Sequence, residues 1–214
     1  MKDKILSKIK NNKIYILLFL CLILFIIILI NVLNGNIQNF DSNIYNLINS
    51  IKSNFMDMFF RNITRFGDEE VLILIALACL IFIKNRKIGG SIAINLASVG
   101  LINHILKEII QRPRPPIELR MVEESSFSFP SGHAMASMAF YGLIMYYIYK
   151  YVKNKTVKNV ICTILSILIF LVGVSRIYLG VHYVSDVIAG FLLSMVYLVL
   201  YITFVLKIFK INQK

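Results

Sequence analysis

A short polar island between two long apolar runs reads Ser175-Arg176-Ile177-Tyr178-Leu179-Gly180-Val181-His182-Tyr183-Val184-Ser185-Asp186. If the residues from His182 onward are helical, Asp186 lies one turn later on the same helix face. A carboxylate there can accept a hydrogen bond from one ring nitrogen and leave the other as a free lone pair. The planar guanidinium of Arg176 suits phosphoryl oxygens. The island is therefore a candidate site for a nucleophilic histidine, although a capped helix start with an incidental ion pair has the same pattern.

The chain around this island is too apolar for an ordinary soluble domain. It has 214 residues, 58% of them hydrophobic, and a mean hydropathy of +0.75. Apolar runs that could span a bilayer cover residues 14–33, 71–83, 88–110, 132–149, 157–174 and 187–206. The second is the weakest, because so short a helix covers only about 20 Å. We predict an all-α fold: a bundle of six transmembrane helices that forms a single membrane domain over residues 1–214.

Two features of the N-terminal part complete this fold prediction. The run 14–33 is too long for a signal peptide and lacks a small-x-small cleavage site, so it is expected to be a retained first span. Residues 36–66 are rich in Asn but carry apolar residues three and four positions apart. This spacing predicts an amphipathic segment of one or two helices that lies in the membrane interface between the first two spans.

The basic residues indicate the orientation in the membrane. A net charge of +12 could suggest a nucleic-acid partner, but the distribution of the charge argues against one. With the N-terminus inside, about two thirds of the 23 Lys and Arg residues fall in the tails and loops on that side. We expect both termini to be cytoplasmic and the loops after the third and fifth spans to face the extracytoplasmic side of the cell membrane.

Those two outer loops carry three polar motifs. The first contains Lys107-x6-Arg114-Pro115 and ends in Pro130-Ser131-Gly132-His133, which opens the fourth span. Free backbone N–H groups at a helix N-terminus bind anions. Three cations (Lys107, Arg114, Arg176) and two histidines (His133, His182) would converge at the outer ends of three helices, where unpaired charges are costly. Together they indicate a phosphate site.

All three motifs resemble the signature motifs of the type 2 phosphatidic acid phosphatase superfamily. This family includes membrane lipid phosphate phosphatases and shares its site with vanadium haloperoxidases. The resemblance covers about residues 100 to 190 in the expected order, with the signature positions between 107 and 186.

The resemblance implies a role for each motif residue. His182 attacks phosphorus and forms a phosphohistidine, Asp186 orients it, and His133 protonates the leaving alcohol. The residues that hold the phosphoryl oxygens are Lys107, Arg114, Ser131, Gly132 and Arg176. Water then hydrolyses the phosphoenzyme.

The function expected from the motifs is that of a membrane lipid phosphatase. Candidate substrates are a polyprenyl pyrophosphate, phosphatidic acid or phosphatidylglycerol phosphate. Alternatives are a phosphotransferase with the same site and a non-catalytic lipid or anion transporter, although mere binding needs no nucleophile with an orienting carboxylate. The sequence leaves open the lipid, the choice between hydrolysis and transfer, and the oligomeric state.

No cofactor or metal is expected. Cys21, Cys79 and Cys162 lie in different apolar runs and lack metal-ligand spacing. In the outer loops Glu123 and Glu124 are adjacent, but they have no carboxylate partners that would complete a Mg²⁺ site.

Three further residues near the motifs have open roles. His104 could tune Lys107, contact the substrate or, as we favour, form a hydrogen bond between helices. Arg112 could steer anionic head groups or face water. Ser175 is expected to support its loop.

Overall fold

The computed structural model describes residues 2–208, with side chains for residues 13–207. Within this part of the chain every regular element is helical, which confirms the all-α class. The elements are α1 (Lys2–Leu33), α2 (Gln38–Asn49), α3 (Asn54–Thr64), η1 (Arg65–Gly67), α4 (Glu69–Phe82), α5 (Arg86–Ile110), η2 (Ile117–Leu119), α6 (Gly132–Tyr151), α7 (Lys155–Tyr178), α8 (Val184–Leu200), η3 (Tyr201–Val205) and α9 (Leu206–Ile208).

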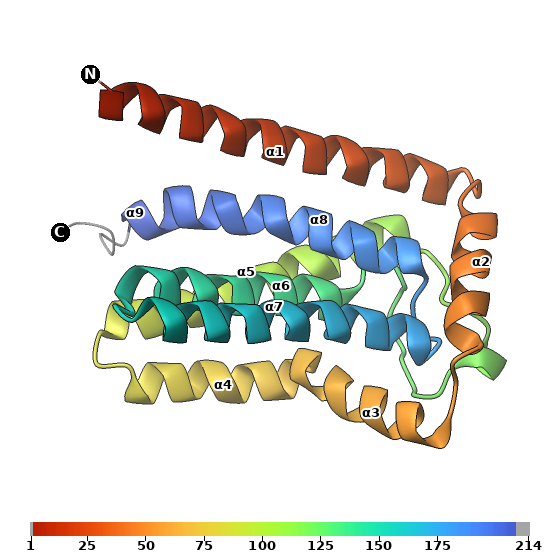
Figure 1. The fold of residues 1–214 in the computed structure, drawn as a ribbon. Helices are drawn as coiled ribbons and strands as arrows, with labels where there is room; N and C mark the ends of the chain where they lie inside the picture. The colour runs from red at the N-terminus through yellow and green to blue at the C-terminus, as the bar shows by residue number, and fades with distance from the viewer. Residues whose placement is uncertain (1, 209–214) are drawn as a thin grey trace.

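The long helices form a bundle with two distinct ends (Figure 1). The beginning of α1 and the short α9 lie at one end, together with the α4–α5 and α6–α7 connections. The α5–α6 and α7–α8 connections lie at the other end, beside α2, which crosses the bundle there. The two connections that carry the polar motifs are therefore at the same end, as the sequence predicts.

Helix α6 is at the centre of the bundle, where it packs against α5, α7 and α8. Its apolar side chains Phe140 and Leu143 are fully buried, and they belong to one core cluster with Leu72 of α4, Ile92 of α5 and Leu198 of α8. Because lipid is as apolar as these side chains, close packing rather than exclusion of water holds such helices together. This central position fixes the N-terminus of α6 among the other elements.

Helix α1 packs against α8, and most of its side chains between residues 13 and 33 are exposed. Leu18, Cys21 and Phe25 form its buried stripe, whereas neighbouring apolar residues such as Phe19 (63% exposed) point outward. A helix with apolar side chains all round is typical of a bilayer rather than of water.

The number of membrane spans is supported in part. Four segments are long and apolar enough to cross a bilayer: Lys13–Leu33, Arg86–Ile110, Lys155–Tyr178 and Val184–Val205. The remaining predicted spans correspond to α4, which has 14 residues, and to α6, which has polar groups at both ends. A count of six spans stays a prediction.

The predicted amphipathic segment contains α2 and α3. Helix α2 crosses the end of the bundle, whereas α3 continues through η1 towards α4, along the outside of α7 (Figure 1). The presence of two helices agrees with the one or two that the sequence predicts. Their location in a membrane interface stays a prediction.

Candidate active site

His182 and Asp186 meet at the start of α8. The helix begins at Val184, so His182 lies before it and the two residues do not share a helix face as we expected. They meet instead because the Asp186 carboxylate turns back to cap the helix and accepts the Tyr183 N–H at 2.9 Å. His182 Nδ1 then lies 3.4 Å from Asp186 Oδ2.

The turn before His182 needs a glycine. Gly180 has a φ of +69°, and a Cβ at this position would lie 2.0 Å from the carbonyl oxygen of Leu119. Both conditions exclude larger residues. The turn directs the other ring nitrogen, His182 Nε2, towards Arg114, whose Nη1 is 3.2 Å away.

His182 is kept neutral by its surroundings. The residue is 2% exposed. Burial, followed by the charge of the Arg114 guanidinium, holds the pKa of His182 well below its usual range. A neutral ring with Nδ1–H directed at Asp186 leaves a lone pair on Nε2.

Two of the three predicted cations are joined by a serine. Lys107, in the last turn of α5, donates to Ser126 Oγ at 2.8 Å. Arg114 follows the helix end at Gln111, where a φ of 50° stops α5, and its Nε donates to the Ser126 carbonyl at 2.6 Å. The proline-rich loop thereby aims Arg114 at the same point as Lys107.

The third cation, Arg176, comes from the last turn of α7 and meets Arg114 through Glu124. The Glu124 carboxylate accepts from Arg114 Nη2 at 3.1 Å and from Arg176 Nη2. Burial alone would raise the pKa of Glu124, but Arg176 and Arg114 hold it below its usual range. Arg176 also donates to Thr64 Oγ1 at 2.8 Å, and its buried Nε lacks a partner among the described residues. A carboxylate of the chain itself thus occupies the point between two guanidinium groups.

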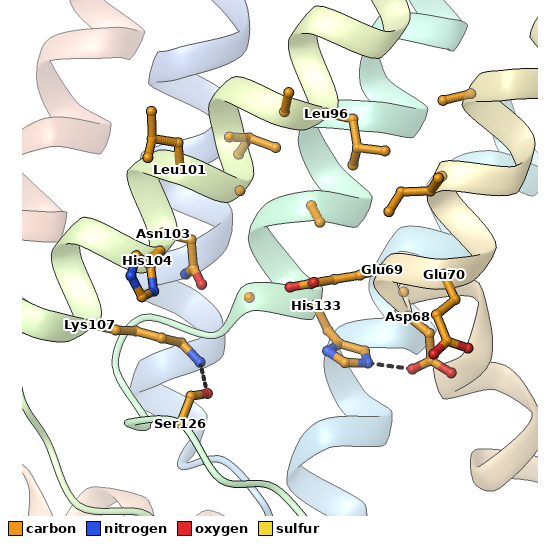
Figure 2. Close-up of a pocket in the computed structure, with 18 of the residues that line it drawn as sticks. Asp68, Glu69, Glu70, Leu96, Leu101, Asn103, His104, Lys107, Ser126 and His133 are labelled. Carbon is orange, nitrogen blue, oxygen red and sulfur yellow. Dashed lines mark hydrogen bonds and ion pairs between the residues drawn. The ribbon is translucent and has the colours of Figure 1, made fainter.

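The N-terminus of α6 supplies the remaining motif residues. Ser131 caps the helix, and its hydroxyl accepts from the Ala134 N–H at 3.5 Å. A Cβ at Gly132 would lie 3.0 Å from Asn103 Oδ1, so this position is tightly packed. His133 Nε2 lies 2.8 Å from Asp68 Oδ1 (Figure 2).

The eight predicted site residues gather around one cavity of about 910 Å³. Five of them line it: Lys107, Arg114, Gly132, His133 and His182. Arg176, Ser131 and Asp186 are not part of the lining, and they are 2%, 0% and 0% exposed. Figure 2 shows Lys107 and His133 on opposite sides of this cavity, between α5, α6 and α4.

The three residues with open roles also have definite places. His104 lines the cavity and is exposed, and no described residue forms a hydrogen bond with its imidazole ring, which contradicts the interhelical role that we favoured. The Ser175 hydroxyl donates to the Val172 carbonyl of its own helix at 2.6 Å. Arg112 is only 10% exposed in its side chain and is paired with two carboxylates, so it does not face water.

Sequence reasoning missed four residues with contacts in the site. They are Asp68, Glu124, Ser126 and Ser128, and Ser128 donates to Asp186 Oδ2 at 2.5 Å. An acidic residue within a loop of many cations was a possible signal for Glu124. The two serines had none, because short polar residues are common in any loop.

Comparison with known proteins places this site in a family. The sequence profile described as the PAP2 superfamily matches residues 89–210, more than half of the chain. The chain belongs to the PAP2 superfamily. This assignment confirms the resemblance that the three motifs indicated.

Relatives in the PAP2 superfamily cover nearly the whole chain. A phosphatidylglycerophosphatase B of Bacillus subtilis is 34% identical over 90% of this chain and 97% of its own. An undecaprenyl-diphosphatase of Sulfolobus acidocaldarius is 29% identical over 86% and 87%. The crystal structure of a transmembrane PAP2-type phosphatidylglycerolphosphate phosphatase from Bacillus subtilis superposes with a TM-score of 0.79 at 30% identity, over 89% of this chain and 96% of that one. These similarities indicate a phosphatase, as the motifs predicted.

Proposed function

We propose that this PAP2 protein is a membrane lipid phosphatase that removes the terminal phosphate of a lipid phosphate or pyrophosphate. The observation that carries the proposal is the shape of the 910 Å³ cavity. The polar part holds cations and histidines, together with the carboxylates of Asp68, Glu69, Glu70 and Glu124. The other part is a groove between α4 and α5 with apolar walls, lined by Ile73, Ala76, Leu77, Leu80, Ala93, Leu96, Ala97 and Leu101. An amphiphile with a phosphate at its end fits both parts at once (Figure 2).

The names of the relatives support a phosphorylated lipid as the class of substrate. They include a phosphatidylglycerophosphatase, an undecaprenyl-diphosphatase and a sphingosine-1-phosphate phosphatase of Rattus norvegicus. All three names describe a phosphate on a long apolar chain. We propose phosphatidylglycerol phosphate, phosphatidic acid or a polyprenyl pyrophosphate as the substrate of this chain.

The proposed first step is attack on phosphorus by His182. Nε2 carries the lone pair, and Nδ1–H donates to Asp186, which stabilises the positive charge that develops on the ring. A bond forms between Nε2 and phosphorus while the bond between phosphorus and the lipid oxygen breaks. His133 donates its proton to that oxygen, so the lipid of a monophosphate leaves as an alcohol and that of a pyrophosphate leaves as the lipid monophosphate.

The second step regenerates the enzyme. Water attacks phosphorus from the side that the leaving group has vacated, and neutral His133 accepts a proton from it. The bond between phosphorus and His182 Nε2 then breaks, and inorganic phosphate departs. The water must therefore come through the part of the cavity that His133 lines.

Fixed cations would stabilise the phosphoryl group in both steps. Lys107, Arg114 and Arg176 supply three positive charges, a role that metal ions take in other phosphoryl-transfer enzymes. Ser131 and Gly132, at the N-terminus of α6, would add the Ser131 hydroxyl and a backbone N–H. The substrate must displace Glu124, whose carboxylate occupies the same guanidinium groups.

Narrowing the apolar groove should impair lipid substrates selectively. Ala97→Trp places a large ring in the cavity wall, about two helical turns before His104 on α5. We expect kcat/KM for a lipid phosphate to fall about tenfold or more, and that for p-nitrophenyl phosphate to stay within about twofold. Both are measured as phosphate release by purified protein in detergent.

The matched control for this experiment is Ile94→Trp. Ile94 belongs to the same helix but is 43% exposed and is not part of the cavity lining. Equal losses on both substrates, or the same selective loss with the control, would contradict a lipid-binding groove.

We further propose six membrane spans with the site on the extracytoplasmic side. In this topology Glu123 and Asn154, both exposed, lie on opposite sides of the membrane. Single cysteines at these positions, in a background without Cys21, Cys79 and Cys162, should react differently with an impermeant thiol reagent on intact cells. Glu123→Cys should be labelled and Asn154→Cys only after lysis. Labelling of both, or of Asn154→Cys alone, would contradict the topology.

A further inference from the structure

Arg112 connects the Asp186 carboxylate to helix α2. Its Nη1 donates to Asp186 Oδ1 at 2.5 Å, and its Nη2 donates to Asp41 Oδ2 at 2.8 Å. The guanidinium also lies over the ring of Tyr183, 4.2 Å from the centroid. A single planar cation thus bridges two carboxylates that are 2% exposed or less.

Asp41 is itself held firmly. Its Oδ1 accepts the Ser185 N–H at 2.9 Å, and its Oδ2 accepts the Ser185 hydroxyl at 2.7 Å. A buried carboxylate is costly unless its oxygens are bound, and here both are. Asp41 therefore joins α2 to the first turn of α8 and fixes the position of Arg112.

The hydrogen bonds of Asp186 divide between its two oxygens. Oδ2 faces the Ser128 hydroxyl, the Tyr183 N–H and His182 Nδ1. Oδ1 faces Arg112, the one cation that pairs with this carboxylate in the described part of the chain. Without Arg112, the buried carboxylates of Asp41 and Asp186 would have no cation between them.

Arg112 lies away from the proposed substrate. It lines a second cavity of about 550 Å³ next to α2, together with Asp41, and is not part of the wall of the 910 Å³ cavity, whereas His182 lines both. It is therefore placed to act on Asp186 and not on the phosphoryl group.

We propose that Arg112 is a positioning residue, held by Asp41, that keeps Asp186 ionised and directed at His182. An ionised, fixed Asp186 keeps the proton on Nδ1 and the lone pair on Nε2. The inference depends on the proposed function, because Arg112 and Asp41 would support the His182–Asp186 pair that the proposed reaction uses.

Kinetics of three single variants test the role. Arg112→Ala and Asp41→Asn should each lower kcat for the lipid phosphate about 10- to 100-fold, with KM within about threefold of wild type. Arg112→Lys should recover only part of the loss, because an ammonium group cannot bridge both carboxylates as a planar fork does. The control is Arg61→Ala, an exposed arginine of α3, which should behave as wild type.

A double-mutant comparison separates positioning from a general structural effect. If Arg112 acts through Asp186, adding Arg112→Ala to Asp186→Asn should cost less than about threefold further. If Arg112→Ala lowers kcat as much in the Asp186→Asn protein as it does in wild type, the proposal is overturned. An Arg112→Ala protein with wild-type kcat would also overturn it, as would one in which KM alone rises, since that would place Arg112 on the substrate.

The outcomes distinguish this inference from the proposed function. Wild-type protein that releases no phosphate from lipid phosphates would contradict the proposed function. Active wild type with unaffected Arg112 and Asp41 variants would contradict only the positioning role. If Arg112→Ala does not fold, as judged by its elution in detergent, Arg112→Lys and Asp41→Asn carry the same comparison.

Discussion

His182→Ala is expected to lose about 10⁴-fold or more of kcat/KM with every phosphate substrate. The reason is that the Nε2 atom forms the bond to phosphorus, and no choice of leaving group replaces a missing nucleophile. The measurement is phosphate release by purified protein from both a lipid phosphate and p-nitrophenyl phosphate. A matching elution profile and melting temperature of the variant in detergent show that its fold is intact. Retention of more than about a tenth of the activity on either substrate would contradict the assignment.

His133→Ala should have an effect that depends on the leaving group. A lipid alkoxide needs a proton as it leaves, so kcat/KM for the lipid should fall about 10²- to 10⁴-fold. p-Nitrophenolate hardly needs one, and activity on its phosphate ester should be partly retained. The comparison uses kcat/KM because His133 also lines the cavity and can contribute to binding.

Equal losses for the two substrates would show that His133 is not the general acid. The same pair of assays on His182→Ala serves as the reference, because its losses should not depend on the leaving group. The ratio between substrates, rather than the size of either loss, therefore separates the two histidines.

The sequence placed several of the predicted site residues at helix ends, and the structure has them there. Lys107, Arg114 and His133 stand at fixed distances from helix ends that prolines and a serine cap define. Charge and hydropathy predict where the helices begin and end. With these helix ends, the α5–α6 and α7–α8 connections lie at the same end of the bundle. Motifs near predictable helix ends are the part of a membrane site that sequence can locate.

Long-range pairs could not be predicted in the same way. Asp41 lies 71 residues before Arg112 and 144 before Ser185. Its burial depends on α2 crossing the end of the bundle, which an amphipathic pattern does not specify. Glu124 is similar, since its contact with Arg176 spans 52 residues and depends on how a loop without regular structure folds back.

The contact between His182 and Asp186 was predicted, but from a backbone geometry that the structure does not have. The spacing of His182 and Asp186 suggested neighbours on a helix face, yet the helix starts only at Val184. Tyr183 and Asp186 are three residues apart, which is the spacing of a capping box, and this cap brings the carboxylate back towards His182. Both geometries are local and bring the same pair together, so the pair itself was predictable although its backbone was not.

The most direct test of the account is phosphate release by purified wild-type protein in detergent and EDTA, compared between a long-chain lipid phosphate and a short water-soluble alkyl phosphate. The account predicts release without added metal, at a higher kcat/KM for the lipid, with loss of both activities in His182→Ala. A protein that prefers the short substrate, requires Mg²⁺, or keeps its activity without His182 would contradict it.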